Sequence, residues 1–417
     1  MKKKLLFTFA LLLTAVTGAW AESWTSGACT VTLSGGVLTV SKTSGTGAME
    51  DYGDVDDQPW KDYRTSITSV VVGSGVTSIG DLAFEDCTNL ASVTFASDSQ
   101  LSNIGLCAFQ NSGLTTIEIP AKVTTIGMSA FTECLSLATV TFATGSLLET
   151  IDVAAFYQCT NLTSVTLPNG LTTIGITAFS DCTNLSSIII PASVTSIGMN
   201  AFDNCTSLAT VTLNSNPFID EFAFLNVPGT VTMNLTANSA GGAYWMTFYN
   251  KVYSFQADAN TKVFKAELVG TTITLHEVEN GIVDAGKAVV LKNTTDGNIV
   301  MTLTTSASGD TQTNSLSAVS DPAGDMSDGS MFVLNNGTNG VGFYKLKAGE
   351  TLGVGKAYLY SASLSNFFGF EGDETTGVKE LKELRSDDNS YYNFNGQRIM
   401  NPTKGLYIVN GKKVVIK

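Results

Sequence analysis

The sequence predicts a β-rich protein: a capped solenoid of short repeats, then a β-sandwich domain and a short C-terminal β-meander. Three observations support this fold class. A phenylalanine recurs at nearly constant spacing through the first half, and short alternating apolar segments separated by turns fill the second half. Hydrophobic residues make up 43% of the 417 residues and charged residues only 14%. Such a chain can bury a substantial core.

The first 21 residues have the three parts of a secretory signal peptide. Residues 2–4 are lysines, residues 5–13 form an apolar run, and residues 19–21 read Ala-Trp-Ala, a small-x-small cleavage site. The apolar run is shorter than the about 20 residues that a transmembrane helix needs. We therefore expect cleavage before Glu22 and a secreted or cell-surface protein with no membrane insertion after cleavage.

Residues 22–66 are predicted to cap the N-terminal end of the solenoid. A cap is physically required, because an open solenoid end would expose apolar side chains. Within this segment, residues 30–40 alternate in polarity on either side of Gly35 and Gly36, which indicates a β-hairpin.

The solenoid is assigned to residues 67–238, where seven phenylalanines each follow an alanine. Their separations are 25, 22, 25, 23, 23 and 22 residues. The phenylalanines are Phe84, Phe109, Phe131, Phe156, Phe179, Phe202 and Phe224. A period of this length is typical of a solenoid, in which stacked neighbours bury the apolar edge that one repeat cannot bury alone. Residues 218–235 depart from the pattern, as an atypical closing repeat would.

Each repeat is predicted to contain one short strand and one helical turn. In the strand, residues such as Val93 and Phe95 alternate with outward positions. An isoleucine-glycine step such as Ile126-Gly127 should reverse the chain, with the glycine at positive φ. The Ala-Phe-x-x-Cys segment that follows has room for a single helical turn. The strand centres should pair in one parallel sheet, in the order Val93, Ile117, Val140, Val165, Ile188 and Val211.

These repeats resemble the BspA-like branch of bacterial leucine-rich repeat proteins, whose units have the form I-G-x-x-A-F-x-x-C-x-x-L-x-x-I-x-I-P. The resemblance covers about residues 67–213 and includes the unit VTTIGMSAFTECLSLATVTF from Val123. It extends upstream over residues 45–70, which look like the N-terminal cap of that family. The resemblance implies binding of host matrix proteins or neighbouring cells.

Five cysteines share one repeat position, three residues after the phenylalanine. They are Cys87, Cys134, Cys159, Cys182 and Cys205. Stacked equivalents have parallel Cβ vectors, and the total of seven cysteines is odd, so full disulfide pairing is impossible. One cysteine per repeat also does not make a metal site. We expect buried free thiols and assign no metal and no other cofactor.

The outward strand positions should form a hydroxyl-rich, nearly uncharged face. The candidate binding residues on this face are Thr94, Glu118, Thr139, Thr141, Ser164, Thr166, Ile189 and Thr212. Solenoids commonly bind partners on their extended sheet face. Threonine also favours strands, so the same pattern could only keep the face soluble.

The remaining chain divides into a predicted β-sandwich over residues 239–371 and a linker and tail over residues 372–417. Many short alternating segments favour the sandwich. Residues 391–417 read as a β-meander and resemble a shortened sorting tail of the type IX secretion pathway, although they could equally complete a domain. Acidic loops at 51–57 and 321–328 lack the regular ligand alternation of an EF-hand and are interpreted as solvated.

Composition excludes several classes of function. His276 is the only histidine, there are three arginines, and the net charge is −14, so histidine clusters for metals and extensive phosphate contacts are both ruled out. No catalytic constellation is present, and we expect no enzyme and no nucleic-acid partner. The leading hypothesis is an exported adhesion protein that binds host or bacterial surface proteins through its solenoid. The alternative is a glycan-binding or carbohydrate-active protein with the sandwich as its working module.

Overall fold

The structure is a computed structural model that describes most of residues 21–361. The gaps in this range are 241–242, 270–271, 296, 320–324, 328–329, 338–339 and 353–355. Beyond residue 361 it describes the backbone of six strands, at 367–370, 378–380, 391–392, 398–399, 405–409 and 412–416. Residues 1–20 of the predicted signal peptide lie outside the described residues.

The N-terminal cap is a three-stranded antiparallel sheet that joins the solenoid edge to edge. Its strands are β1 (Glu22–Ser26), β2 (Cys29–Ser34) and β3 (Val37–Lys42). The predicted hairpin is confirmed, with Gly35 and Gly36 at φ 58° and 82° between β2 and β3. Strand β3 then pairs in parallel with β4 (Ser69–Val72). The 3₁₀ helices η1 (Val55–Asp57) and η2 (Lys61–Ser66) flank the buried Trp60. The cap therefore closes the solenoid by pairing β3 with β4 and by burying Trp60.

One side of the solenoid is the predicted parallel sheet. After β4 it contains β6 (Ser92–Phe95), β8 (Thr116–Ile119), β10 (Thr139–Phe142), β12 (Ser164–Val165), β14 (Ser187–Ile190), β16 (Thr210–Leu213) and β18 (Thr230–Thr236). The prediction of one sheet was wrong in one respect, because the ladder breaks between β12 and β14. Near this point the two coils are linked by bonds from Ser186 N and Ser186 Oγ to Thr163 O, both at 3.3 Å. The short strand β12 ends three residues before Pro168.

A second parallel sheet of two-residue strands forms another side of the coil and runs without interruption. Its strands are β5 (Ser78–Ile79), β7 (Asn103–Ile104), β9 (Thr125–Ile126), β11 (Thr150–Ile151), β13 (Thr173–Ile174), β15 (Ser196–Ile197) and β17 (Phe218–Ile219). A glycine follows five of these seven isoleucines; it allows close approach of the neighbouring coil and does not adopt positive φ. A Cβ on Gly175 would lie 2.6 Å from the Asp152 carbonyl carbon.

The third side of each coil is a pair of tight turns, so the predicted helical turn is corrected. Two non-glycine residues per coil adopt left-handed φ, for example Leu82 at 57° and Asp86 at 60°. A regular helix cannot continue through such residues. The backbone between them bonds to the next coil instead, as from Phe109 N to Ala130 O at 2.8 Å. This side is thus a third hydrogen-bonded face of the solenoid.

The repeat phenylalanines form a continuous column inside the coil. Neighbouring rings from Phe84 to Phe224 are stacked with centroids 5.2–5.6 Å apart. Trp60 of the cap stacks on the first ring at 5.9 Å, and Tyr253 packs on the last at 6.0 Å. The column therefore begins in the cap and ends on a residue that follows the repeats.

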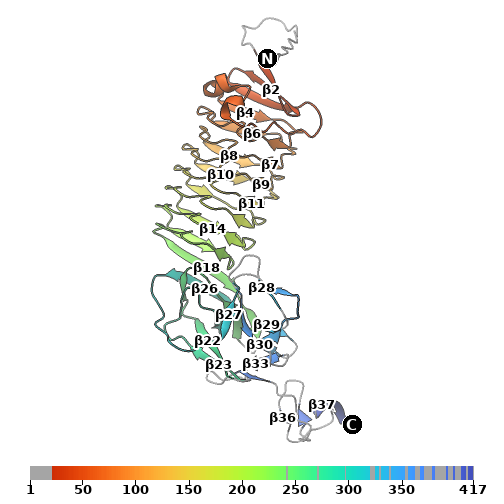
Figure 1. The fold of residues 1–417 in the computed structure, drawn as a ribbon, viewed down its shortest axis with the longest axis vertical. Helices are drawn as coiled ribbons and strands as arrows, with labels where there is room; N and C mark the ends of the chain where they lie inside the picture. The colour runs from red at the N-terminus through yellow and green to blue at the C-terminus, as the bar shows by residue number, and fades with distance from the viewer. Residues whose placement is uncertain are drawn as a thin grey trace.

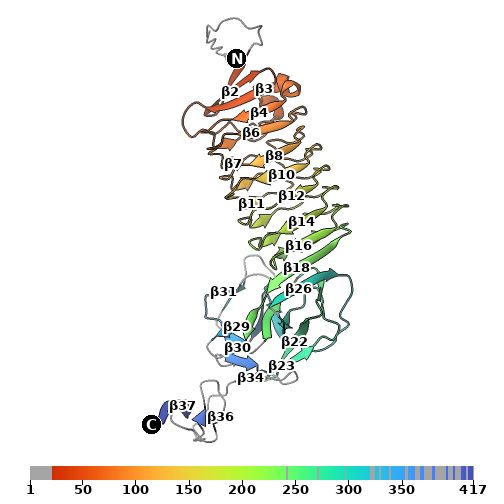
Figure 2. The ribbon, with the colours of Figure 1, turned by 180° about the vertical axis from the view of Figure 1, so that it is seen from behind.

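The domain after the repeats is built from two sheets and is joined to the solenoid through β18. In the first sheet, β18 pairs antiparallel with β26 (Asn298–Thr304), which continues to β21 (Ser254–Ala257) and β24 (Ile282–Val283). The closing repeat therefore leaves no open strand edge at β18, because the following domain pairs with this strand (Figures 1 and 2). The apolar core is likewise continuous from Cys29 to Met301.

The second sheet of this domain has eleven strands, and the two sheets fit a β-sandwich. Its strands are β19 (Asn238–Ala240), β20 (Ala243–Phe248), β25 (Val289–Asn293), β22 (Thr261–Val269), β23 (Thr272–Glu277), β34 (Val378–Glu380), β33 (Phe367–Phe370), β30 (Gly340–Lys345), β29 (Met331–Gly337), β32 (Ala357–Tyr360) and β27 (Leu316–Ala318). A separate two-stranded sheet pairs β28 (Asp325–Met326) with β31 (Thr351–Leu352). Strand β34 lies within the segment interpreted as a linker.

The C-terminal meander is present as a four-stranded antiparallel sheet. Its strands are β36 (Arg398–Ile399), β35 (Tyr391–Tyr392), β37 (Gly405–Val409) and β38 (Lys412–Ile416). For the described residues, the structure is the predicted β-rich solenoid followed by further sheets, with the helical turns replaced by non-helical ones.

Candidate recognition surface

The predicted hydroxyl-rich strand face exists, and its eight candidate residues form two rows across the coils. Thr141 pairs with Glu118, and Ile189 pairs with Thr212, in one row. Thr139 pairs with Ser164 in the other row. All eight side chains are exposed or half-buried, and Ile189 is 61% exposed. Thr166 is exposed but lies just beyond the end of β12. The strand face is thus a real surface of the molecule.

The strand face also continues onto the following domain, which the sequence did not indicate. Thr212 pairs with Thr232 of β18, and Thr232 pairs with Thr302 of β26. Both added threonines are half-buried. Alternation alone shows which side of a strand is outward, but it does not show which strand of a later domain becomes the neighbour.

A second surface was missed by the sequence analysis: an exposed apolar stripe along the turn that follows the second sheet. The apolar stripe consists of one residue from each of five successive coils, the residue directly after the Ile-Gly or Ile-Asp pair. These residues are Leu106, Met128, Val153, Ile176 and Met199. Four of them are 37–45% exposed, and Val153 is half-buried. Single exposed apolar residues are normal, whereas a contiguous group indicates a contact surface.

Backbone hydrogen bonds hold the stripe in register. Cys107 N donates to Met128 O, and Thr177 N donates to Met199 O, both at 2.9 Å. Equivalent bonds reach the carbonyls of Val153 and Ile176. The stripe begins after Asp81 and ends before Glu221, which occupy the same position in the flanking coils. The sequence signal was available as the recurring apolar residue after the Ile-Gly or Ile-Asp pair.

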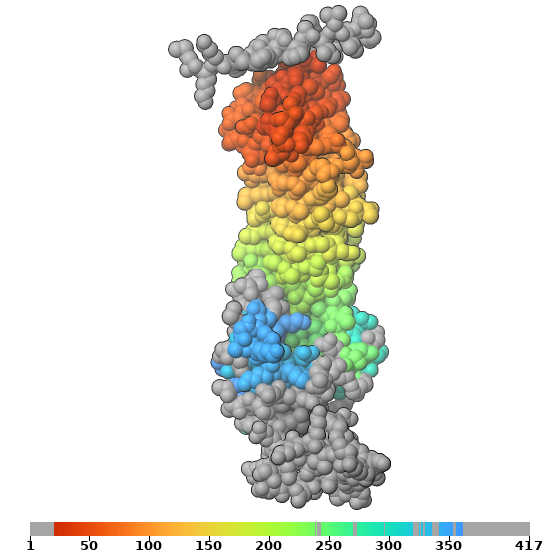
Figure 3. All heavy atoms as spheres, turned by 90° about the vertical axis from the view of Figure 1, so that its right-hand side faces the viewer, coloured from red at the N-terminus to blue at the C-terminus, as the bar shows by residue number. Residues whose placement is uncertain are grey.

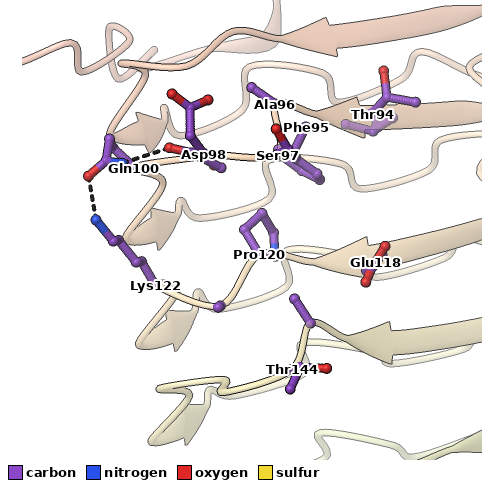
Figure 4. A pocket seen from close by; sticks show the side chains of 14 residues that line it. Thr94, Phe95, Ala96, Ser97, Asp98, Gln100, Glu118, Pro120, Lys122 and Thr144 are labelled. Atoms are coloured by element: carbon purple, nitrogen blue, oxygen red, sulfur yellow. Dashed lines mark hydrogen bonds between the residues drawn. The ribbon is translucent and has the colours of Figure 1, made fainter.

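A third feature is a cavity of about 540 Å³ at the ends of β6, β8 and β10. It arises because loops of unequal length stand side by side. Residues 96–102 connect β6 to β7 and residues 143–149 connect β10 to β11, whereas the shorter segment 120–124 connects β8 to β9. The short loop is recessed between two long ones, and we call this recess the notch (Figure 4).

The repeat cysteines are free thiols, as predicted, and four of the five donate a hydrogen bond between coils. Cys134, Cys159, Cys182 and Cys205 donate from Sγ to the carbonyl of the phenylalanine in the preceding coil, at 3.1–3.2 Å. All seven cysteines are free. Burial raises the pKa of the Cys159 and Cys182 thiols well above the ordinary value of 9.0. Thiols that stay protonated are poor nucleophiles, so the column is structural.

The ionisable groups of the second domain make local contacts. His276 Nε2 lies 2.9 Å from Glu267 Oε2, and the buried Lys265 donates to Asp310 O at 3.0 Å. Among the described residues, no group of three His, Cys, Asp or Glu side chains could hold a metal ion. No helix within the described part of the chain is long and apolar enough to cross a membrane.

Comparisons with known proteins identify the repeats. The family described as "BspA type Leucine rich repeat region" matches residues 62–150 and 144–252, with six copies. A search of curated proteins found no match. Residues that carry the family pattern, including the phenylalanine column and the cysteine column, lie inside the matched range.

Solved structures of bacterial leucine-rich repeat proteins are similar over about half of the chain. The pneumococcal vaccine antigen PcpA is 21% identical, with 49% of this chain and 68% of that chain covered and a TM-score of 0.31. A leucine-rich cell surface protein from Faecalibacterium prausnitzii is 24% identical, with coverage of 50% and 74% and a TM-score of 0.28. A leucine-rich repeat protein from Bacteroides ovatus is 21% identical, with coverage of 52% and 69% and a TM-score of 0.29. At such TM-scores these likenesses carry no argument about function. The family match and the stacked coils together establish the solenoid as a BspA-type leucine-rich repeat region.

Proposed function

We propose that the chain is an exported, non-enzymatic recognition protein whose solenoid binds host matrix or cell-surface proteins. The observation that carries this proposal is the apolar stripe. It places five apolar side chains in one row on the outside of a rigid scaffold. The signal-peptide pattern of residues 1–21 supports export.

The stripe and the strand face lie on different sides of the coil, so they are two separate places where a partner could dock. The stripe offers apolar contacts, which drive association because they remove apolar surface from water. The strand face offers hydroxyls and one carboxylate, Glu118. We expect the stripe to anchor the partner. Since the stripe is uncharged, binding should weaken only modestly up to 0.15 M salt, where charges are screened beyond about 8 Å.

The test is a binding titration of the mature chain on immobilised fibronectin, fibrinogen and laminin. Met128→Lys combined with Ile176→Lys should weaken binding at least about tenfold, because it brings two unpaired charges into an apolar contact. The matched pair Thr141→Lys and Thr166→Lys does the same for the strand face. If neither double variant changes binding to a protein that the parent chain binds, the solenoid is not the recognition module.

The glycan-binding alternative places the working site in the second domain. Binding that both solenoid double variants leave unchanged, and that substitutions in the second domain away from the strand face abolish, would favour this alternative over the solenoid.

A further inference from the structure

We propose that the notch is a binding site for a neutral saccharide unit. The notch shares no residue with the apolar stripe, whereas Thr94 and Glu118 belong to both the notch and the strand face. The notch has a volume of about 540 Å³, which lies within the roughly 300–1,000 Å³ of small-molecule sites. It is a feature of three particular coils and not of the repeat itself.

The walls of the notch combine an apolar patch with many hydrogen-bonding groups. Phe95 and Pro120 contribute flat carbon surface, and alanines of the three loops add to it. Side-chain hydroxyls of Thr94, Ser97 and Thr144 surround this patch (Figure 4). A pyranose ring has the same two characters, with a C–H face that packs on carbon surface and hydroxyls that both donate and accept.

Charged and amide side chains at the two ends of the notch add further hydrogen-bonding groups for a saccharide. Lys122 Nζ donates to Gln100 Oε1 at 2.5 Å, and Gln100 Nε2 donates to Asp98 O at 2.6 Å. This pair fixes one wall of the notch in place. Glu118 stands at the other end on β8, where its carboxylate can accept bonds from two neighbouring hydroxyls (Figure 4).

The charge balance favours a neutral ligand over an acidic one. Lys122 is the only lysine or arginine between residues 65 and 250, and its ammonium is already bonded to Gln100. Two carboxylates, of Asp98 and Glu118, line the same notch. An acidic saccharide would therefore meet more negative than positive charge.

The backbone argues against an extended peptide. Peptides often bind by adding a strand to a free sheet edge. Strands β6, β8 and β10 are consecutive members of one sheet, and each is paired on both sides. The notch therefore offers side chains but no strand edge.

The experiment is saturation-transfer difference NMR on the full mature chain, residues 22–417. The probes are the methyl glycosides of glucose, galactose, mannose and N-acetylglucosamine, with sialic acid, a uronic acid and an uncharged tetrapeptide as comparisons. We expect transfer to at least one neutral glycoside. Ser97→Trp should abolish it by filling the notch, because Ser97 is exposed and lines the site.

A conservative variant in the notch and two control variants outside it separate an effect on binding from an effect on folding. Glu118→Gln should raise the dissociation constant about tenfold or more, because hydrogen bonds to an ionised group are stronger than those to a neutral one. Asn169→Trp and Glu149→Gln change exposed residues outside the notch and should leave transfer unchanged. Unfolding midpoints equal to that of the parent chain show that the variants fold. The proposal is wrong if no neutral glycoside shows transfer, if only an acidic sugar or the tetrapeptide does, or if Ser97→Trp retains the signal.

Discussion

At the scale of single residues, the phenylalanine column carries much of the solenoid's stability. Phe156 is fully buried and stacks between Phe131 and Phe179, each with its centroid 5.2 Å away. Backbone hydrogen bonds to both neighbouring coils hold its position. The coil therefore cannot collapse into a cavity that a smaller side chain would leave.

We predict that Phe156→Ala lowers the free energy of unfolding by about 3–5 kcal/mol. Thr166→Ala, at an exposed position of the strand face, should cost less than about 1 kcal/mol. Urea titrations followed by circular dichroism measure both. Equal losses in the two variants would contradict the inward and outward assignment.

The buried thiols make stability depend on pH in the alkaline range. Burial raises the pKa of Cys87 and Cys205 to about 12 and that of Cys134 to about 11, from an ordinary value of 9.0. Below pH 9 the thiols are protonated in both states, so they do not affect the pH dependence. As pH rises from 9 toward 11, the unfolded chain loses these protons far more than the folded chain, and the free energy of unfolding falls.

The urea midpoint should therefore drop between pH 8 and pH 10.5 more steeply for the parent chain than for a variant with alanine at Cys134, Cys159 and Cys182. The variant controls for the lysines and tyrosines, which titrate in the same range. Identical slopes would mean that the thiols are not buried in the protonated form.

At the scale of elements, the glycine of the Ile-Gly step allows adjacent coils to approach. A Cβ on Gly175 would meet backbone atoms of the preceding coil at 2.6–2.8 Å. Asp152 and Asp220 occupy the same repeat position with a side chain, so individual coils can adjust. Whether glycine is required at this position therefore depends on how closely the neighbouring coil approaches.

We predict that Gly175→Ala lowers the free energy of unfolding by about 1–3 kcal/mol, because backbone must shift to admit the methyl group. Gly170→Ala is the matched control, since its nearest contact would be an ordinary 3.4 Å to Leu148 O and its φ is not positive. Differential scanning calorimetry compares the two melting temperatures. If the control melts as low as Gly175→Ala, close approach is not the cause.

The elements also show how far sequence reasoning reaches. Strand positions and inward residues followed from the repeat, because each coil obeys the same local pattern. The tight turns could not be predicted in this way. Hydrogen bonds to the next coil stabilise the left-handed φ of Leu82 and Asp86, and no glycine marks these positions in the sequence. The apolar stripe was visible in the sequence but was missed, whereas the notch depends on three loops lying side by side.

At the scale of the whole molecule, the solenoid and the following domain form one continuous column (Figure 3). Strand β18 belongs to both, and Tyr253 closes the aromatic column that Trp60 opens. The N-terminal cap was predicted from the sequence, but the C-terminal closure was not, because pairing between β18 and β26 joins segments about 70 residues apart. The second domain therefore serves as the C-terminal cap that a solenoid requires.

The central claim is that the solenoid is the module that recognises a protein partner. Hydrogen–deuterium exchange of the mature chain, with and without the matrix protein it binds, tests this claim most directly. We predict that slowed exchange falls on peptides from residues 104–201, which include the apolar stripe. Slowed exchange confined to residues 254–361 would contradict the account, because it would place recognition in the second domain.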